Sequence, residues 1–454
     1  MKKTATILAL ALAAAFPCHS QDAAIDNSIL QAEMEAQLPT GMAGWMQGDY
    51  MTGDWWGYRT KLRESGVDYF GFLNFILNGN PVGGIDSNHA TFVSDAYMGL
   101  RFDLEKLFGW KGGQFVVSGI NREGPALDEY VGATYSVQQM VGGQRLFLYQ
   151  VFLKQQFTES LSLKIGRYGA SDDFNTSPFY GYNLNNGITG DIRNVLFDTR
   201  FSAYPFAVWA ASLFYETDDF FVKAGIFQTS ERMFENDDHG VNWSIKGEDG
   251  FTAHWEIGWT PELFKRPVPT GETTYDKDGK ATVAPTVMKG MPGHYWIGGT
   301  YSKWDYYERF GGGFQDHSYG FYANADQMVY QEIPGGTEGL YAFLAAGYYP
   351  QSAISIIPFQ VNAGLHYRGL IPGRNEDRTL LSFIYGDFSD DYATATQIPG
   401  GSRAKSEKVI EAGYRIQITP WAYIQPDAQY VIDPGGTGDI DNALVVGFQA
   451  GVTF

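Results

Sequence analysis

The last twelve residues of the chain, ALVVGFQAGVTF at positions 443–454, indicate the fold most directly. Larger apolar residues alternate there with small or polar ones, which is the period-two pattern of a β-strand with two unlike faces. The first face carries Leu444, Val446, Phe448, Ala450, Val452 and Phe454. The second face carries Val445, Gly447, Gln449, Gly451 and Thr453. The pattern predicts a final strand that places its first face, Phe454 included, against lipid or against the core of a soluble sheet.

The same alternation recurs along the chain and is clear in residues 96–104, 361–368, 408–418 and 422–432. In residues 147–154 it assigns Phe147, Tyr149, Val151 and Leu153 to the apolar face. The opposite faces are rich in Gly, Gln, Asn, Tyr and charged residues. A two-layer soluble sandwich also alternates, with its polar face in solvent. Tyr and Trp near the strand ends, as at Trp255 and Trp259, favour lipid outside and water inside.

Sixteen such segments can be placed, an even number, as single-chain bacterial barrels require. They are residues 66–78, 91–104, 113–123, 145–157, 160–169, 206–216, 219–229, 252–260, 293–304, 318–330, 339–348, 356–369, 378–388, 407–418, 421–432 and 442–454. We therefore predict an all-β fold, a transmembrane antiparallel β-barrel of about 16 strands with a short N-terminal periplasmic segment. A barrel of that size encloses an aqueous channel.

One stretch resembles a spanning helix, because Gly339–Tyr367 contains no Asp, Glu, Lys or Arg. Pro350 and Pro358 interrupt it, and proline removes a helical hydrogen bond and clashes with the preceding turn. Residues 347–355 are better interpreted as a turn between two strands. No other segment after residue 20 offers the roughly 20 apolar residues that a spanning helix needs.

Composition fits a membrane protein and excludes nucleic-acid binding. Charged residues make up 18% of the chain and aromatic residues 16%, and the formal net charge is −19. Aromatic rings suit the boundary between lipid and water, whereas a nucleic-acid phosphate backbone needs a basic patch, which is absent from the sequence.

The N-terminal 20 residues have the features of a secretory signal. Lys2 and Lys3 precede a short apolar run from Ile7 to Phe16, and we expect cleavage before Gln21. Cleavage at Cys18 as a lipoprotein is the alternative, which Pro17 fits poorly. We therefore expect three parts: a signal at 1–20, a periplasmic extension at 21–51 with a short helix at 29–38, and a barrel at 52–454. Cys18 is the only cysteine, so the mature chain is expected to have no disulfide.

Three connections between predicted strands are long: 170–200, 230–250 and 265–290. Long loops of such barrels lie outside the cell or fold into the pore. The loop at 265–290, rich in Pro, Thr, Gly and Lys, is expected to be mobile and solvated.

The strand parity gives candidate residues for contact with a solute, because charged side chains avoid lipid and should face the channel. These are Arg101, Asp103, Arg122, Lys154, His366, Arg368, Glu411, Arg415 and Asp427. Asp172 and Asp173 follow a strand, and could contact the solute, cap a turn or bind a cation. The alternative for every candidate is pairing with a neighbouring side chain that stiffens the wall. Neither a metal-ligand spacing nor a catalytic motif appears.

Six stretches, taken in order, resemble the carbohydrate-selective porins of the OprB type. They are TGDWWGYRTKL at 52–62, FGWKGGQF at 108–115, SGINREG at 118–124, GRYG at 166–169 leading to Asp172-Asp173-Phe174, GLIPGR at 369–374, and IQPDAQYVIDPGG at 424–436. Arg122 ends a predicted strand within one of them, which makes it the most favoured single candidate.

The resemblance implies a sixteen-stranded channel in the bacterial outer membrane for passive diffusion of small neutral sugars, with neither catalysis nor a cofactor. The expected surroundings are outer-membrane lipid and lipopolysaccharide. For the oligomeric state, both a monomer and a homotrimer are compatible with the sequence. Two other functions are also considered. The first is a general porin, or one selective for polyols or organic acids, and the second is a secreted β-rich glycoside hydrolase, which would use paired carboxylates.

Overall fold

The computed structural model describes residues 41–140, 144–235, 237–269, 274–275, 281–282, 286–307, 310 and 314–454. The expected signal at 1–20 and the expected helix at 29–38 lie outside these residues. No helix in the described part of the chain is long and apolar enough to cross a membrane.

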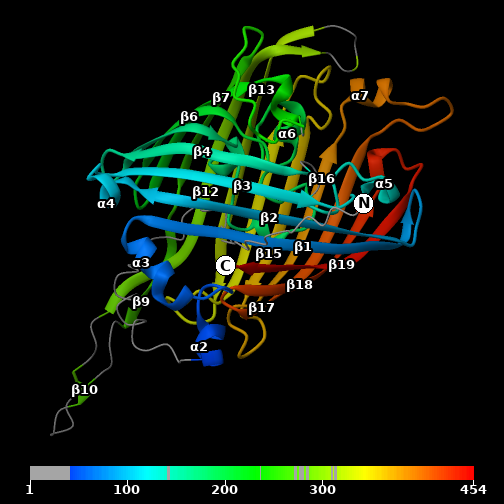
Figure 1. Cartoon of the computed structure of the whole chain (residues 1–454). Helices are drawn as coiled ribbons and strands as arrows, with labels where there is room; N and C mark the ends of the chain where they lie inside the picture. Colours follow the sequence, from blue (N-terminus) through cyan, green and yellow to red (C-terminus); the bar gives the residue numbers. More distant parts are fainter. Residues whose placement is uncertain are drawn as a thin grey trace, which may run out of the picture.

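Sixteen antiparallel strands within the described residues form one closed barrel, in which β1 pairs with β19 (Figure 1). They are β1 (Val67–Gly84), β2 (His89–Asp103), β3 (Gly113–Glu123), β4 (Leu146–Gln156), β5 (Leu161–Tyr168), β6 (Val208–Glu216), β7 (Phe220–Thr229), β8 (Gly250–Trp259), β12 (Thr286–Tyr307), β13 (Phe314–Gln331), β14 (Gly339–Tyr348), β15 (Phe359–Arg368), β16 (Arg378–Asp387), β17 (Ser406–Thr419), β18 (Ala422–Ile432) and β19 (Asp441–Thr453). Each corresponds to a predicted segment, so the predicted fold is confirmed. Closure pairs every strand on both sides and leaves the sheet without an edge.

The parity of the strands is as predicted over most of the wall. On β8, Trp255 and Ile257 are 38% and 51% exposed, whereas His254 and Glu256 between them are buried. The exposed set faces outward, and the buried set meets residues that fill the lumen. Lipid outside and a polar interior follow from this alternation.

The prediction for the chain end is only partly confirmed. Phe454 lies beside Tyr69 and Leu73, which have outward parity, but it is only 2% exposed. Met51 covers it, and the Met51 amide donates to the carbonyl of Thr453 at 2.7 Å. The residues that precede β1 thus shield the last aromatic ring and secure the seam between first and last strands.

The prediction for residues 147 and 149 is wrong. The pairing of β3 with β4 shifts register between Val117 and Gly119, so the parity of β4 changes along its length. Phe147 and Tyr149 are buried, and Tyr149 reaches a residue inside the barrel. A β-bulge inserts an extra residue and reverses the faces beyond it, and a count by twos cannot detect it.

The prediction for residues 265–290 is also wrong in part. β9 (Glu262–Pro269) pairs with the first residues of β12, and the short strands β10 (Thr274–Tyr275) and β11 (Ala281–Thr282) pair with each other. This hairpin leaves the barrel at the end that holds Phe454 (Figure 1), which we call the Phe454 end. The other two long connections lie at the opposite end, here called the loop end. Strand direction decides this, because antiparallel strands alternate between the two ends.

Short helices mark the connections. At the Phe454 end are α2 (Gly41–Gln47), η1 (Trp55–Gly57), α3 (Tyr58–Glu64) and α4 (Leu104–Phe108). At the loop end are α5 (Asp128–Val131), η2 (Ala170–Asp172), η3 (Tyr180–Tyr182), α6 (Asn194–Asp198), η4 (Glu231–Phe234), α7 (Asp390–Ala395) and η5 (Pro434–Gly436). The main apolar cluster joins the wall to residues 169–207, including Phe174, Tyr180 and Ile192. The core therefore lies inside the barrel, around this connection and the loop that carries α5.

Candidate functional site

The connection between β5 and β6, residues 169–207, folds into the lumen and is called the pore insert here. Wall side chains accept hydrogen bonds from its backbone. Glu256 on β8 accepts from the Asn175 amide at 2.5 Å, and Glu411 on β17 accepts from the amides of Leu184 and Asn185 at 2.5 and 3.2 Å. Buried backbone groups need such partners, so these carboxylates replace the water that the loop gives up.

Further contacts attach the pore insert to other parts of the wall. Gln360 on β15 accepts from the Asn194 amide at 2.8 Å, and the Ser177 hydroxyl donates to Asp326 on β13 at 2.7 Å. The loop that carries α5 is held in the same way, because Glu407 accepts from the amides of Thr134 and Tyr135. Two segments thus occupy the lumen and narrow it.

Glu411 and Asp427, both candidates for solute contact, are buried behind the pore insert. Glu411 is occupied by insert amides, and Asp427 accepts from the side-chain amide of Gln429 at 3.2 Å. Their inward parity is as expected, but their observed partners are protein groups. Glu411 holds the insert in place, and Asp427 is paired within the wall.

Arg122 is likewise buried, and its guanidinium pairs with Asp95 on β2 at 3.2 Å. It also lies 4.6 Å from the ring centre of Tyr204 in the pore insert, and the Tyr204 hydroxyl donates to Asp95 at 2.9 Å. The most favoured candidate therefore anchors the insert to the wall.

Asp172 and Asp173 lie at the start of the pore insert. The Tyr149 hydroxyl donates to Asp172 at 2.5 Å, and the Lys164 ammonium lies 2.9 Å from Asp173. Burial raises the pKa of the Asp172 carboxyl, and the charge of Lys164 opposes that shift. The described residues contain no group of three or more side chains suited to a metal ion. These contacts favour the alternative to those three roles, pairing with neighbouring side chains, which here fixes the start of the loop.

Three other candidates lie near the Phe454 end. Arg101 pairs with Asp68 at 3.0 Å, and Asp103 caps α4 by accepting from the amides of Glu105 and Lys106. The Lys154 ammonium lies 5.5 Å from the centre of the Phe214 ring. These groups stabilise the rim and the wall of the barrel.

Two of the three remaining candidates, Arg368 and Arg415, belong to a row of three arginines. In the strand register Arg368 on β15 is opposite Arg378 on β16, and Arg378 is opposite Arg415 on β17. All three have inward parity, like His366 and Glu411 on the same strands, and all are partly exposed. We call them the arginine row.

Tyr182 of the pore insert lies against this row. Its ring centre is 4.8 Å from the Arg378 guanidinium carbon and 4.5 Å from that of Arg415. The Arg415 guanidinium is also 4.2 Å from the centre of the Tyr423 ring. Arg415 donates from Nε to Gln425 Oε1 at 2.7 Å. These five residues, partly exposed except Gln425, form what we call the arginine–tyrosine site.

His366 supports this site from behind. It is buried among the rings of Phe179, Tyr182 and Phe343, whose centres lie 5.2, 5.5 and 5.6 Å from its own. Neither ring nitrogen of His366 has a hydrogen-bond partner among the described residues. The imidazole therefore acts here as a flat packing surface that positions Tyr182.

Sequence reasoning placed Arg368 and Arg415 in the lumen but missed Arg378, Tyr182 and Tyr423 as members of one site. The parity of β18 does point Tyr423 and Gln425 inward, which was an available signal. Arg378 is the first residue of β16, where alternation is hardest to assign. Tyr182 lies in a loop, and no periodic pattern predicts where a loop side chain will point.

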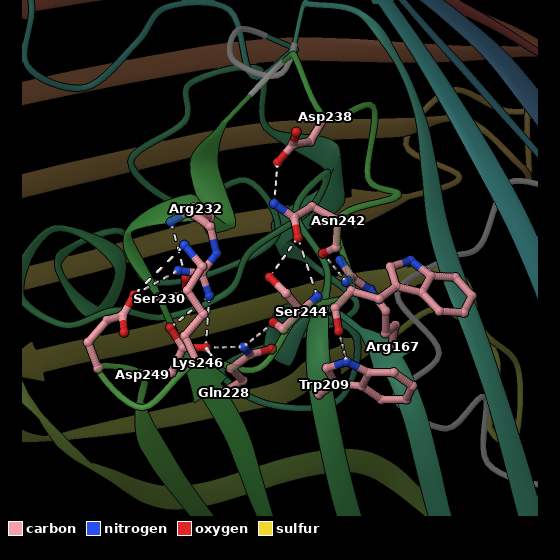
Figure 2. A network of polar contacts seen from close by, with 12 residues as sticks. Arg167, Trp209, Gln228, Ser230, Arg232, Asp238, Asn242, Ser244, Lys246 and Asp249 are labelled. Atoms are coloured by element: carbon pink, nitrogen blue, oxygen red, sulfur yellow. Dashed lines mark hydrogen bonds and ion pairs between the residues drawn. The ribbon is translucent and has the colours of Figure 1, made fainter.

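The connection between β7 and β8, residues 230–249, behaves differently and is called the outer loop. Figure 2 shows it against the outward side of the wall at the loop end. The Arg167 guanidinium donates to the Asn242 carbonyl at 2.6 Å, and Trp209 Nε1 donates to the Trp243 carbonyl at 2.9 Å. Both wall residues have outward parity, so this loop covers polar positions on the outside of the barrel.

Comparisons with known proteins agree with this architecture. A family model described as carbohydrate-selective porin, OprB family, matches residues 90–454. Porin B of Pseudomonas aeruginosa is 26% identical over 433 residues, which cover 89% of this chain and 91% of that protein. Putative porin QuiX of Acinetobacter baylyi is 23% identical over 452 residues, which cover 93% and 97%. The high-pH structure of Pseudomonas putida OprB superposes with a TM-score of 0.78 at 25% identity, over 90% of this chain and 99% of that one.

Proposed function

The chain belongs to the carbohydrate-selective porins of the OprB family and is an outer-membrane sugar channel, and on that premise we propose that the arginine–tyrosine site is where it selects its solute. The observation that carries the proposal is the contact of Tyr182 with both Arg378 and Arg415. Through it the pore insert and the wall contribute to one surface.

The chemistry of the site suits a small sugar. A pyranose presents an apolar C–H face and a rim of hydroxyl groups. The rings of Tyr182 and Tyr423 offer flat surfaces for the C–H face, and the guanidinium groups of Arg378 and Arg415 offer donors for the hydroxyls. A channel needs binding that is weak enough for release on the far side, and a few hydrogen bonds made in water meet that requirement.

The same contacts favour a channel over a glycoside hydrolase. A hydrolase needs two accessible carboxyl groups on either side of the scissile bond. Glu411 and Asp427 are buried, and Glu411 already accepts two amides of the pore insert. These two acids are therefore occupied by protein groups, which supports passive diffusion over catalysis.

The test compares Tyr182→Ala with the wild-type channel in planar bilayers. Glucose should block the ion current of the wild-type channel, and the variant should lose most of that block because the stacking surface is gone. Aromatic contact with a ligand ring contributes about 1 kcal/mol, which corresponds to roughly a fivefold weaker affinity.

The matched control is Tyr215→Ala, which removes an exposed tyrosine of outward parity on β6. It should leave the glucose block unchanged. Equal glucose block by the wild-type channel and Tyr182→Ala would contradict the assignment of the site.

A further inference from the structure

The arginine row has more positive charge than its surroundings neutralise. Like charges that are directly opposite on neighbouring strands destabilise a sheet, and here three follow one another across β15, β16 and β17. Arg368 has a carboxylate partner, because Glu376 lies 2.6 Å away. Within the described residues, neither Arg378 nor Arg415 has a carboxylate oxygen within 4.0 Å of its guanidinium nitrogens.

Acidic side chains on or next to the strands of the row have other partners. The Asp377 carboxylate accepts hydrogen bonds from Nε and Nη2 of Arg374, each at 2.8 Å, and from the Tyr414 hydroxyl at 2.6 Å. Glu411 accepts from insert amides, and Glu338 accepts from the Thr337 amide at 3.2 Å. The uncompensated charge at Arg378 and Arg415 therefore faces the lumen.

The two uncompensated arginines differ in how many donors they have left. Arg415 uses Nε for Gln425 and Nη2 for the carbonyl of Gly181. The Arg378 guanidinium has a ring contact with Tyr182, but it makes no side-chain hydrogen bond to another described residue. A guanidinium with an unoccupied fork matches the two oxygens of a carboxylate, which it can bind through two parallel hydrogen bonds.

We propose that the arginine–tyrosine site binds sugar acids, meaning polyhydroxylated monocarboxylates, more tightly than neutral sugars, with the solute carboxylate on Arg378. This rests on the proposed function, because the same tyrosines receive the ring and the same arginines meet its polar groups. The charged contact is the stronger one, since hydrogen bonds to ionised groups exceed those between neutral groups. The site also draws anions toward the lumen from a distance, which makes the effect dependent on ionic strength.

The test uses two probes that differ only in charge: glucuronate and its neutral amide, glucuronamide. Current block of the purified full-length channel is measured in planar bilayers at about 0.1 M KCl, where screening still allows the contact. For the wild-type channel we expect glucuronate to bind at least about tenfold more tightly than glucuronamide, which corresponds to one charge-assisted hydrogen-bonded pair. Raising the salt concentration should reduce that ratio.

Arg378→Gln keeps hydrogen-bonding groups but removes the charge, so glucuronate block should weaken far more than glucuronamide block and the preference for glucuronate should disappear. Arg378→Lys should retain part of the preference, because the charge returns without the planar fork. Lys154→Gln is the charge-matched control, since it removes a positive charge of inward parity from β4 on another part of the wall. It should leave the ratio unchanged.

Equal block by glucuronate and glucuronamide in the wild-type channel would overturn the proposal. An unchanged preference for glucuronate over glucuronamide in Arg378→Gln would also overturn it. Either result can accompany a normal glucose block that depends on Tyr182, in which case the sugar site stands and only its preference for acids fails. Loss of glucose block in the wild-type channel would instead contradict the proposed function.

Discussion

The pore insert and the outer loop are both connections at the loop end of the barrel, yet they fold in opposite directions. The insert enters the lumen, where Glu256 and Glu411 of the wall accept its backbone amides. The outer loop lies on the outward side, where it is held by Arg167 and Trp209 and by contacts within itself (Figure 2).

Composition accounts for the difference. Residues 169–207 are rich in Asn, Gly and aromatic residues, and their few charges can be paired inside the barrel. Residues 230–249 carry charges at a much higher density, including Glu231, Asp237, Asp238 and Glu248. Burying a charge is costly unless it is paired, so the highly charged loop stays in water and the less charged one can enter the lumen. The comparison shows that a loop enters a barrel only when the wall supplies partners for its backbone.

The largest expected effect follows from removing one of those partners. Glu411→Ala leaves the amides of Leu184 and Asn185 buried without an acceptor, at about 1–3 kcal/mol each. The pore insert should detach from β17, and single-channel recordings should show a larger and noisier conductance. Glu231→Ala in the outer loop is the control and should leave the conductance unchanged. A quiet, wild-type conductance in Glu411→Ala would contradict the role given to wall carboxylates.

The next largest effect is a difference in unfolding free energy between two arginine variants, one that anchors the pore insert and one in the outer loop. Arg122→Ala leaves Asp95 buried without its cation, which should cost about 3–5 kcal/mol of unfolding free energy. Arg232→Ala in the outer loop should cost about 1 kcal/mol. Asp249, its partner at 2.8 Å, keeps donors in the Gln228 side chain and the Lys246 amide.

Heat-modifiable gel migration and denaturant unfolding of the folded barrels would measure both variants. Similar losses for Arg122→Ala and Arg232→Ala would remove the distinction between a buried anchor and a surface one.

The two regions should also respond in opposite ways to pH. Burial raises the pKa of Asp191 in the pore insert to about 6, and Arg193 opposes the shift. Its folded pKa lies above the ordinary value of 3.8, so protonation favours the folded form. The stability that Asp191 contributes to the folded insert is complete below about pH 3.8 and is lost as pH rises through about 6. Asp191→Asn should remove the dependence of insert stability on pH between 4 and 7, measured as conductance noise.

The pKa of Asp249 in the outer loop is shifted in the opposite direction to that of Asp191. Burial raises its pKa, but hydrogen bonds from the Lys246 amide, Gln228 and Arg232 together outweigh burial and lower it. Its contribution is complete above about pH 3.8 and is lost as pH falls through the folded value. Acid should therefore loosen the outer loop while it secures the insert, and proteolysis of residues 230–249 at low pH would test this. Parallel responses of the two loops would contradict the assignment.

The smallest effect is expected from Trp243→Ala. The Trp243 ring meets the Trp209 ring edge to face at 5.8 Å, a contact of about 0.5–1.5 kcal/mol. Because the loop lies outside the lumen, faster proteolysis of the outer loop should accompany an unchanged conductance and an unchanged glucose block. A change in glucose block would mean that the outer loop influences the channel interior.

The sequence predicted the wall well, because the property that defines a strand is local. Alternation along 422–432 placed Tyr423, Gln425 and Asp427 on one face, and the structure keeps them there. The same rule failed at Tyr149, because β4 itself has an extra residue relative to β3 at this point, which changes its parity. The rule also says nothing of Tyr182, since a residue in a loop has no periodic neighbours.

By itself, the sequence determined the number of strands, their order, which face of most strands meets lipid, and the family to which the chain belongs. Only the tertiary structure decided that Arg368, Arg378 and Arg415 share one level of the wall, because that alignment depends on the register of three separate strands. It also decided that Glu411 holds a loop more than 200 residues away in the chain instead of meeting a solute. The pleat of a strand is intrinsic to its own residues, whereas the docking of a loop depends on hydrogen bonds to partners that only closure of the barrel brings near.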